Sequence, residues 1–233
     1  MTDTDPENIV FTEAKESNKQ LTDELNQKQN QLVQMNVSTP PLERADLQYD
    51  ISSIMNELKQ SGMQAAAWGM AKESFQIYME AKRWEDAVRC CDLLYQTEQA
   101  ASITALGNGL WLAVTYPIDP ELSIVMLNNL IDDTPDSSDG AAVAAATAHY
   151  IADIRFEGEK RDSTMFLTMN MLSKVAERHS QIDSQDKFNM WMQRLELTDP
   201  SVFIKRLGMV IDAIVAEHWW YDRKALRAEL PVN

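Results

Sequence analysis

Glycine and proline are scarce in this chain of 233 residues, which contains seven glycines and eight prolines. Both residues break helices, and together they make up roughly 12% of an average protein. No segment alternates between apolar and polar residues for long enough to predict a strand. The sequence therefore predicts an all-α protein.

Positive charge is also scarce, because 21 Lys and Arg residues stand against 36 Asp and Glu residues, a formal net charge of −15. Proteins gain affinity for nucleic acids and for anionic lipids by clustering basic side chains. This chain contains no basic cluster. Nucleic acid is therefore not among the expected partners.

Long uncharged apolar runs are missing as well. A helix that crosses a bilayer needs about 20 predominantly apolar residues. The most apolar stretch, residues 202–221, is interrupted by Lys205, Arg206, Asp212, Glu217 and His218. We therefore expect a buried helix there and no membrane insertion.

Only two cysteines are present, Cys90 and Cys91, and they are adjacent in a helical pattern. Neighbouring side chains on a helix point about 100° apart, so a disulfide between them would be strained. Free thiols are typical of a reducing compartment. The N-terminal residues MTDTDPENIVFTEAKES are acidic and contain no apolar signal-peptide core. We therefore expect a cytoplasmic protein.

The common short motifs of metal, phosphate and nucleophilic sites are absent from the sequence. HExxH, CxxC, Walker A and GxSxG motifs are missing, and His149, His179 and His218 are far apart. The acidic stretch DDTPDSSDG, residues 132–140, lacks the spacing of a calcium loop, so we predict a solvated turn. We expect no catalytic residue, no metal site and no cofactor, and hence not an enzyme.

Residues 1–41 are rich in polar residues and end at Pro40 and Pro41. This composition buries too little apolar surface to offset the entropy of ordering, so a flexible tail is expected. A short helix can form in it behind a capping box at Ser17, with an apolar stripe that Lys28 interrupts. The stripe consists of Leu21, Leu25, Leu32 and Met35. Two hypotheses remain, a partly helical flexible tail or a helix that orders on a partner.

Residues 42–233 have apolar residues at helical spacing and are expected to form a single all-helical domain. Helix starts are indicated by Asp119, by Asp199 and by Asp139 with Gly140. The predicted helices are residues 43–60, 63–81, 84–97, 99–115, 120–132, 140–155, 162–180, 185–195 and 200–228. Short connections between them predict antiparallel hairpins.

The segment 67–98 resembles a tetratricopeptide (TPR) repeat, most clearly in AKRWEDAVRCC. Tyr78 takes the late aromatic position of the first helix, Trp84 opens the second helix, and Ala87 is the small residue where the helices cross. Phe75 departs from the pattern, because the family has a small residue there. This departure predicts a more widely spread hairpin.

The resemblance implies a TPR-like stack of antiparallel helical hairpins with a groove lined by the first helix of each pair. In the matching repeat, the groove would include Lys72, Gln76 and Met79. In the hairpin that follows, it would include Asn108 and Thr115. Such a groove binds an extended or helical segment of another protein.

Trp219, Trp220 and Tyr221 are consecutive, and Arg223 follows closely. On the helix predicted for residues 200–228 they would spread over about 200°, so they cannot all face one core. Aromatic residues beside an arginine are typical of the energetic centres of protein interfaces. Two hypotheses remain, that these residues close the end of the core or that they contact a partner.

Methionine is abundant, with thirteen residues, and its flexible side chain suits both irregular cores and adaptable binding surfaces. The methionines considered for such a surface are Met63, Met70, Met79, Met165, Met169, Met171, Met190 and Met192. Filling the core and contacting a partner remain open as alternatives.

These features predict a non-catalytic protein-interaction module that acts as an adaptor, an assembly factor or a chaperone. The expected partner is another protein, and the negative charge of the chain favours one with a basic segment. A homodimer is a further candidate. The alternatives are an obligate subunit of a larger complex and an all-α enzyme or small-ligand-binding protein.

Overall fold

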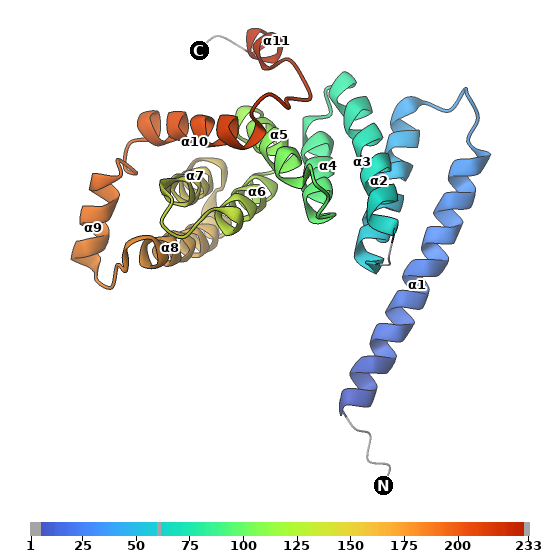
Figure 1. The fold of residues 1–233 in the computed structure, drawn as a ribbon, viewed down its shortest axis with the longest axis horizontal. Helices are drawn as coiled ribbons and strands as arrows, with labels where there is room; N and C mark the ends of the chain where they lie inside the picture. Colours follow the sequence, from blue (N-terminus) through green and yellow to red (C-terminus); the bar gives the residue numbers. More distant parts are fainter. Residues whose placement is uncertain (1–5, 60–61, 231–233) are drawn as a thin grey trace. The chain divides into compact units, whose positions relative to one another are not determined.

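The computed structural model describes residues 6–59 and 62–230, and within these ranges it contains eleven helices and no strand (Figure 1). The prediction of an all-α fold is confirmed, and consecutive helices pack as antiparallel pairs. The chain divides into two compact units, the first ending at Ser102 and the second beginning at Ile103. The predicted boundary between a tail and a single domain at residue 41 stays a prediction.

The first unit contains α1 (Pro6–Gln34), α2 (Pro41–Leu58), α3 (Met63–Glu80) and α4 (Trp84–Gln96). α1 is longer than the short helix expected, and Ser17 lies inside it rather than at a cap. The predicted apolar stripe of α1 packs in one cluster with α2 and α3, and its Leu25 is buried there. Lys28, which interrupts the stripe, donates a hydrogen bond to Asp50 of α2 (Nζ–Oδ2 2.7 Å). α1 is therefore held to α2 by apolar contacts and by an ion pair.

The α3–α4 pair forms the hairpin that was expected for the TPR-like segment. Ala87 of α4 is fully buried, as expected for a small residue at a helix crossing. Tyr78 of α3 is also buried, and its hydroxyl donates a hydrogen bond to Asp46 of α2 (2.7 Å). Phe75 is buried beside it. α3 thus packs against α2 on one side and α4 on the other.

The second unit is organised around the alanine-rich helix α7, which packs against α6, α8 and α10. The helices of this unit are α5 (Ser102–Thr115), α6 (Pro120–Asp133), α7 (Asp139–Arg155), α8 (Gly158–Ser180), α9 (Gln185–Arg194), α10 (Pro200–Val215) and α11 (Arg223–Ala228). The alanines of α7 that are fully buried are Ala141, Ala142, Ala144, Ala145, Ala148 and Ala152. Small side chains allow the three neighbouring helices to approach α7 closely.

Two of the three predicted helix caps are confirmed. Asp119 and Asp199 each accept a hydrogen bond from the backbone N–H two residues later (2.9 Å in both). The prediction for α7 is wrong, because its N-cap is Ser138, whose Oγ accepts the N–H of Gly140 (3.1 Å). Asp139 is the first residue of the helix, which leaves its carboxylate available for other contacts.

The prediction of one helix over residues 200–228 is also wrong. α10 ends at Val215, and Ala216 breaks the helix with a positive φ of 50° and a ψ of −120°. α11 begins after Asp222, which accepts hydrogen bonds from two N–H groups of its first turn. The consecutive aromatic residues therefore lie in the loop between α10 and α11.

Gly107 lies inside α5 at a point where α10 approaches very closely. A Cβ atom at this position would overlap Val215 Cγ2 and would lie 3.0 Å from Ile214 Cγ1. Gly208 lies inside α10, and a Cβ atom there would meet no atom within 4 Å. Glycine is therefore required for packing at position 107 but not at position 208.

We predict that Gly107→Ala lowers the free energy of unfolding of the second unit by about 1–3 kcal/mol, because the added methyl group overpacks the α5–α10 contact. Gly208→Ala is the matched control, and it should raise stability by about 0.5–1 kcal/mol, since alanine favours the helix more than glycine does. Urea denaturation followed by circular dichroism measures both. Equal effects of the two substitutions would contradict the close contact.

Candidate functional site

The three residues predicted to line the groove of the first hairpin lie together on α3. Lys72, Gln76 and Met79 are spaced by four and three residues, so they share one side of the helix. Gln76 is exposed, whereas Lys72 and Met79 are half-buried. The Lys72 ammonium lies 4.9 Å from the centroid of the Phe75 ring. Only part of this stripe is therefore open to a partner.

Burial dominates the ionisation of the polar and thiol groups near this stripe. It lowers the pKa of Lys72 to about 7, because the charged ammonium is poorly solvated there. It raises the pKa of both Cys90 and Cys91, which are buried and form no disulfide. The prediction of free thiols is confirmed, and the raised pKa values keep them protonated and unreactive.

Asn108, the first residue predicted for the second hairpin, is fully buried in α5. Its Oδ1 accepts the N–H of Trp220 (3.1 Å), and its Nδ2 donates to the carbonyl of Thr104 (2.8 Å). Its own carbonyl accepts a hydrogen bond from the Tyr221 hydroxyl (2.6 Å). Asn108 thus anchors the loop between α10 and α11, and its side chain is not at the surface. Thr115, at the end of α5, is half-buried.

The aromatic residues of this loop pack on α5 and on one another. The Tyr221 ring lies 5.5 Å from Trp111 and 5.9 Å from Trp219, measured between ring centroids. The Arg223 guanidinium lies 3.6 Å above the Trp219 ring and bonds to Asp212 (Nη1–Oδ1 2.5 Å). The loop therefore closes one end of the core, as the first of the two hypotheses proposes.

Trp219, Trp220, Tyr221 and Arg223 are each half-buried, so one side of each remains accessible. Their role in a partner contact stays a prediction. They belong to the second unit, as Asn108 and Thr115 do, whereas the α3 stripe belongs to the first. The structure brings Asn108 together with Trp220 and Tyr221, and it does not group Thr115 with them.

The side chains of His149 and His179 have polar partners in the second unit, and His149 is described first. His149 Nδ1 lies 3.0 Å from the hydroxyl of Thr168, and burial lowers the pKa of His149. His218 is exposed. Within residues 6–59 and 62–230, no group of three or more His, Cys, Asp or Glu side chains is placed to hold a metal ion.

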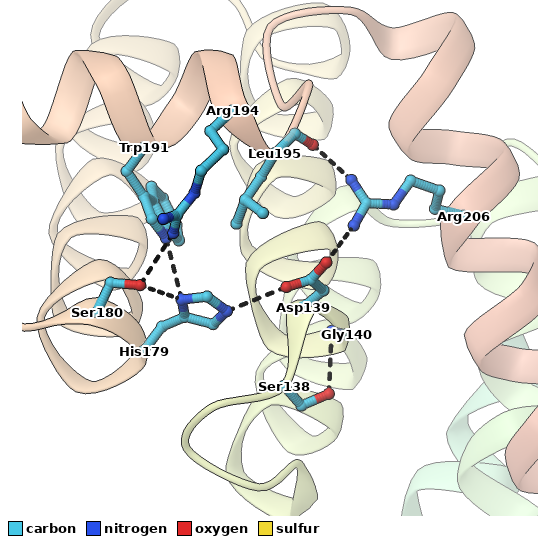
Figure 2. A network of polar contacts seen from close by, with 9 residues as sticks. All are labelled: Ser138, Asp139, Gly140, His179, Ser180, Trp191, Arg194, Leu195 and Arg206. Carbon is cyan, nitrogen blue, oxygen red and sulfur yellow. Dashed lines mark hydrogen bonds and ion pairs between the residues drawn. The ribbon is translucent and has the colours of Figure 1, made fainter.

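The third histidine lies in a polar network at which α7, α8, α9 and α10 meet (Figure 2). Asp139 lies between His179 and Arg206, with its Oδ1 3.1 Å from His179 Nε2 and its Oδ2 accepting from Arg206 (2.8 Å). The other ring nitrogen of His179, Nδ1, lies 3.1 Å from Trp191 Nε1 and 2.6 Å from Ser180 Oγ. The contact between Asp139 and His179 joins residues 40 positions apart in the sequence.

These partners fix the tautomer of His179. An indole N–H can only donate, so Nδ1 accepts from Trp191 and the ring proton lies on Nε2, which donates it to Asp139. A serine, a histidine and a carboxylate in contact are also the groups of an acyl-transfer triad. In this network, however, the Nδ1 lone pair already accepts from Trp191, and Asp139 is paired with Arg206. The network therefore ties α7 to three other helices.

α8 exposes two large apolar side chains in its N-terminal half. Phe166 and Leu167 are 67% and 64% exposed, whereas the buried side of the helix contains Thr164 and Thr168 together with Leu172, Val175 and Ala176. We call its exposed side the α8 outer face, which consists of Asp162, Ser163, Phe166, Leu167, Met169, Asn170, Ser173 and Lys174. These residues cover one side of the helix, opposite the buried threonines. Large apolar side chains thus face solvent where a helix of a monomer usually presents polar ones.

A groove of about 540 Å³ between α6 and α8 adjoins the α8 outer face. Its apolar lining comes from Ile131 of α6 and from residues of α8, including Leu167 and Val175. Two cations of α8, Lys174 and Arg178, also line it. Of the methionines predicted as candidates for an adaptable surface, Met169 is exposed and Met171 lines the groove.

Phe166 and Leu167 were not among the residues predicted for a binding surface. The signal that could have found them is the stretch STMFLTMNMLS, residues 163–173, which contains no charged residue although charged residues make up 24% of the chain. Helical periodicity alone does not say which side of such a stretch is buried.

No protein family, curated protein or solved structure matches this chain. The TPR resemblance of the first hairpin is thus not accompanied by a family assignment. Among the described residues, no helix is both long enough and apolar enough to span a bilayer.

We predict that Lys72→Met raises the free energy of unfolding at pH 7 by about 1 kcal/mol, a value reduced from the full pKa shift because Lys72 is partly exposed. The folded-state pKa of Lys72, about 7, lies below its ordinary value of 10.5, so the unfolded chain binds more protons between these pH values. Stability due to Lys72 therefore rises with pH across this window, and the substitution should flatten that rise. Urea denaturation at pH values from 7 to about 10 measures this dependence of stability on pH. The control is Lys19→Met, because Lys19 is exposed. An unchanged slope would contradict the burial of Lys72.

We predict that Asp139→Asn lowers the free energy of unfolding of the second unit by about 1 kcal/mol, because both His179 and Arg206 lose their anionic partner. The matched control is Asp136→Asn in the loop that precedes α7, whose carboxylate is 81% exposed and 3.8 Å from Arg178. Thermal denaturation followed by the fluorescence of Trp191 and its neighbours compares the two variants. Equal stabilities would show that the network contributes nothing.

Proposed function

We propose that this chain is a non-catalytic protein-interaction module that binds a partner protein through the α8 outer face. The observation that carries the proposal is the exposure of Phe166 and Leu167 on the solvent side of α8. Exposed apolar patches that interrupt a polar surface are typical of sites for other proteins. The adjoining groove, with its apolar walls and two cations, extends this surface toward α6.

The free energy of burying these apolar side chains favours the binding of a partner. Burying a large apolar side chain contributes about 1.5–3 kcal/mol when it is fully exposed beforehand. Because Phe166 and Leu167 are each about two-thirds exposed, covering both would contribute about 2–4 kcal/mol. A contribution of this size is a large part of the binding energy of a transient protein complex.

Binding is favoured over catalysis because the groups of the His179 network and the two thiols are engaged or unreactive within the chain. The Nδ1 lone pair of His179 accepts from Trp191, and Asp139 is paired with Arg206. Burial keeps the thiols of Cys90 and Cys91 protonated. An adaptor, an assembly factor, a chaperone and a subunit of a larger complex all use such a surface, whereas an enzyme needs an accessible base or nucleophile.

The TPR-like hairpin offers a second candidate surface on α3. It consists of Lys72, Gln76 and Met79, the residues that the resemblance assigns to the groove. The internal bonding of Asn108 argues against a continuation of this groove along α5. A basic partner segment would suit the net negative charge of the chain on this surface.

The proposal is tested by cross-linking in cells with a photoreactive amino acid at Leu167, at Gln76 or at Ser201, an exposed control position. We predict a discrete cross-linked protein, identified by mass spectrometry, from position 167 and none from position 201. Phe166→Ser in the same chain should reduce the product about tenfold, since the loss of one buried phenyl ring exceeds 1.4 kcal/mol. Met209→Ser, which removes a side chain of similar exposure (69%) from α10, should leave it unchanged.

A product from position 76 and none from position 167 would place the binding surface on α3 instead. The triple change of Lys72, Gln76 and Met79 to residues of opposite character should then abolish the product. No product at either position would contradict the interaction module itself.

A further inference from the structure

A cavity of about 300 Å³ in the second unit is bounded by α5, α6, α10 and the loop between α6 and α7. Sites for small molecules have volumes from about 300 Å³ upward. The cavity shares no lining residue with the α8 outer face or with the groove beside that face. It is therefore a separate site, large enough for a compact small molecule.

Apolar side chains form most of the wall of this cavity. They are Ile103 and Leu106 of α5, Leu130 of α6, and Val210, Ala213 and Ile214 of α10. Leu106 and Leu130 are buried, whereas Ile103 is 40% exposed, so the wall extends from the core to the surface. Such a wall stabilises the apolar part of a bound molecule by removing it from water.

The polar side chains of the cavity all come from one segment, the end of α6 and the loop that leads to α7. They are Asp133, Thr134 and Ser138, and we call them the polar side of the cavity. The Thr134 hydroxyl donates to the carbonyl of Leu130, and Ser138 Oγ accepts the N–H of Gly140 (3.1 Å). Each hydroxyl oxygen retains a lone pair for a further hydrogen bond. The polar side therefore presents oxygen acceptors opposite the apolar wall.

The electrostatics of the polar side favour a cation. Among the described residues that line the cavity, Asp133 alone is ionisable, and it forms no ion pair within this part of the chain. Asp133 is also the last residue of α6, so the carbonyl groups at the negative end of this helix lie beside it. The positive end of α7 is compensated, because Ser138 binds the N–H of Gly140 and Asp139 occupies the first turn.

Two arginines reach this region from other helices, and both have partners there. Arg178 of α8 donates to two backbone carbonyls at the end of α6 (2.6 and 3.3 Å). Arg206 of α10 donates to the carboxylate of Asp139 (2.8 Å). Neither arginine lines the cavity. Because residues 132–139 carry four carboxylates against these two guanidinium groups, the polar side keeps a negative potential.

From this lining, we propose that the cavity binds a small organic amine. Its ammonium group has three N–H donors, which match the carboxylate of Asp133 and the hydroxyl oxygens of Thr134 and Ser138. Its apolar body packs on α5 and α10. An anion is disfavoured because it would meet the Asp133 carboxylate, and a neutral ligand forgoes the charge-assisted hydrogen bond. Since an ion pair at an exposed carboxylate is weak, we expect a dissociation constant in the millimolar range.

Three ligands of similar size and different charge test the proposal, namely 2-phenylethylamine, 2-phenylethanol and 3-phenylpropionate. NMR titration of the full chain up to about 20 mM ligand measures each dissociation constant. The amine should bind about fourfold more tightly than the alcohol, and the carboxylate should bind more weakly than both. Asp133→Asn should weaken the amine about fourfold and leave the alcohol unchanged. Asp162→Asn on α8 is the matched control, because it removes one exposed carboxylate outside the cavity and should leave all three constants unchanged.

A second variant tests the apolar wall. Ala213→Leu extends a larger side chain into the cavity and should weaken the amine and the alcohol alike, about tenfold, because the space for the phenyl ring is lost. Ala225→Leu, at an exposed alanine of α11, is its control and should change neither constant. Circular dichroism establishes that each variant is folded.

An ammonium group can also come from a lysine of a partner protein, and N-acetyl-lysine methylamide is the probe for that source. We expect it to bind more weakly than 2-phenylethylamine, and tighter binding would overturn the free amine as ligand. The proposal would also be overturned by no binding of the amine, by a carboxylate that binds as tightly, by an amine preference that survives Asp133→Asn, or by unchanged binding to Ala213→Leu. None of these outcomes bears on cross-linking at position 167, which tests the proposed function separately.

Discussion

The close packing of helices around α7 is the constraint on which the second unit depends. Because the buried side of α7 consists mainly of alanine, α8 approaches it closely and has room for side chains such as Thr164 and Thr168. Thr168 satisfies its hydroxyl within the fold, by donating to the carbonyl of Thr164 (2.9 Å). The large apolar residues Phe166 and Leu167 are left on the opposite side of α8. The packing against α7 therefore determines which side of α8 faces solvent.

Polar contacts between distant parts of the sequence complete this arrangement. The carboxylate of Asp139 joins His179 and Arg206, and the amide of Asn108 holds the loop that carries Trp220 and Tyr221. Groups that look reactive in the sequence thus have partners inside the fold. The large apolar side chains that remain accessible on α8 are the basis of the proposed binding function.

Local sequence features predicted the helices well, because apolar spacing and helix caps such as Asp119 act over a few residues. They failed where contacts between residues distant in the sequence determine the local structure. The helix predicted for residues 200–228 breaks because Trp220 and Tyr221 bond to Asn108, more than 100 positions earlier. The α8 outer face was missed for a related reason, since the periodicity of Phe166 and Leu167 does not reveal which side faces α7.

The measurement that most directly tests the central claim is fluorine NMR of the full chain with trifluoromethyl-phenylalanine in place of Phe166. If a partner protein covers the α8 outer face, the resonance moves as the protein that cross-links at position 167 is added, and a soluble paramagnetic agent broadens it less at high partner concentration. A resonance that keeps its position and stays fully accessible to the agent at every concentration would contradict the account.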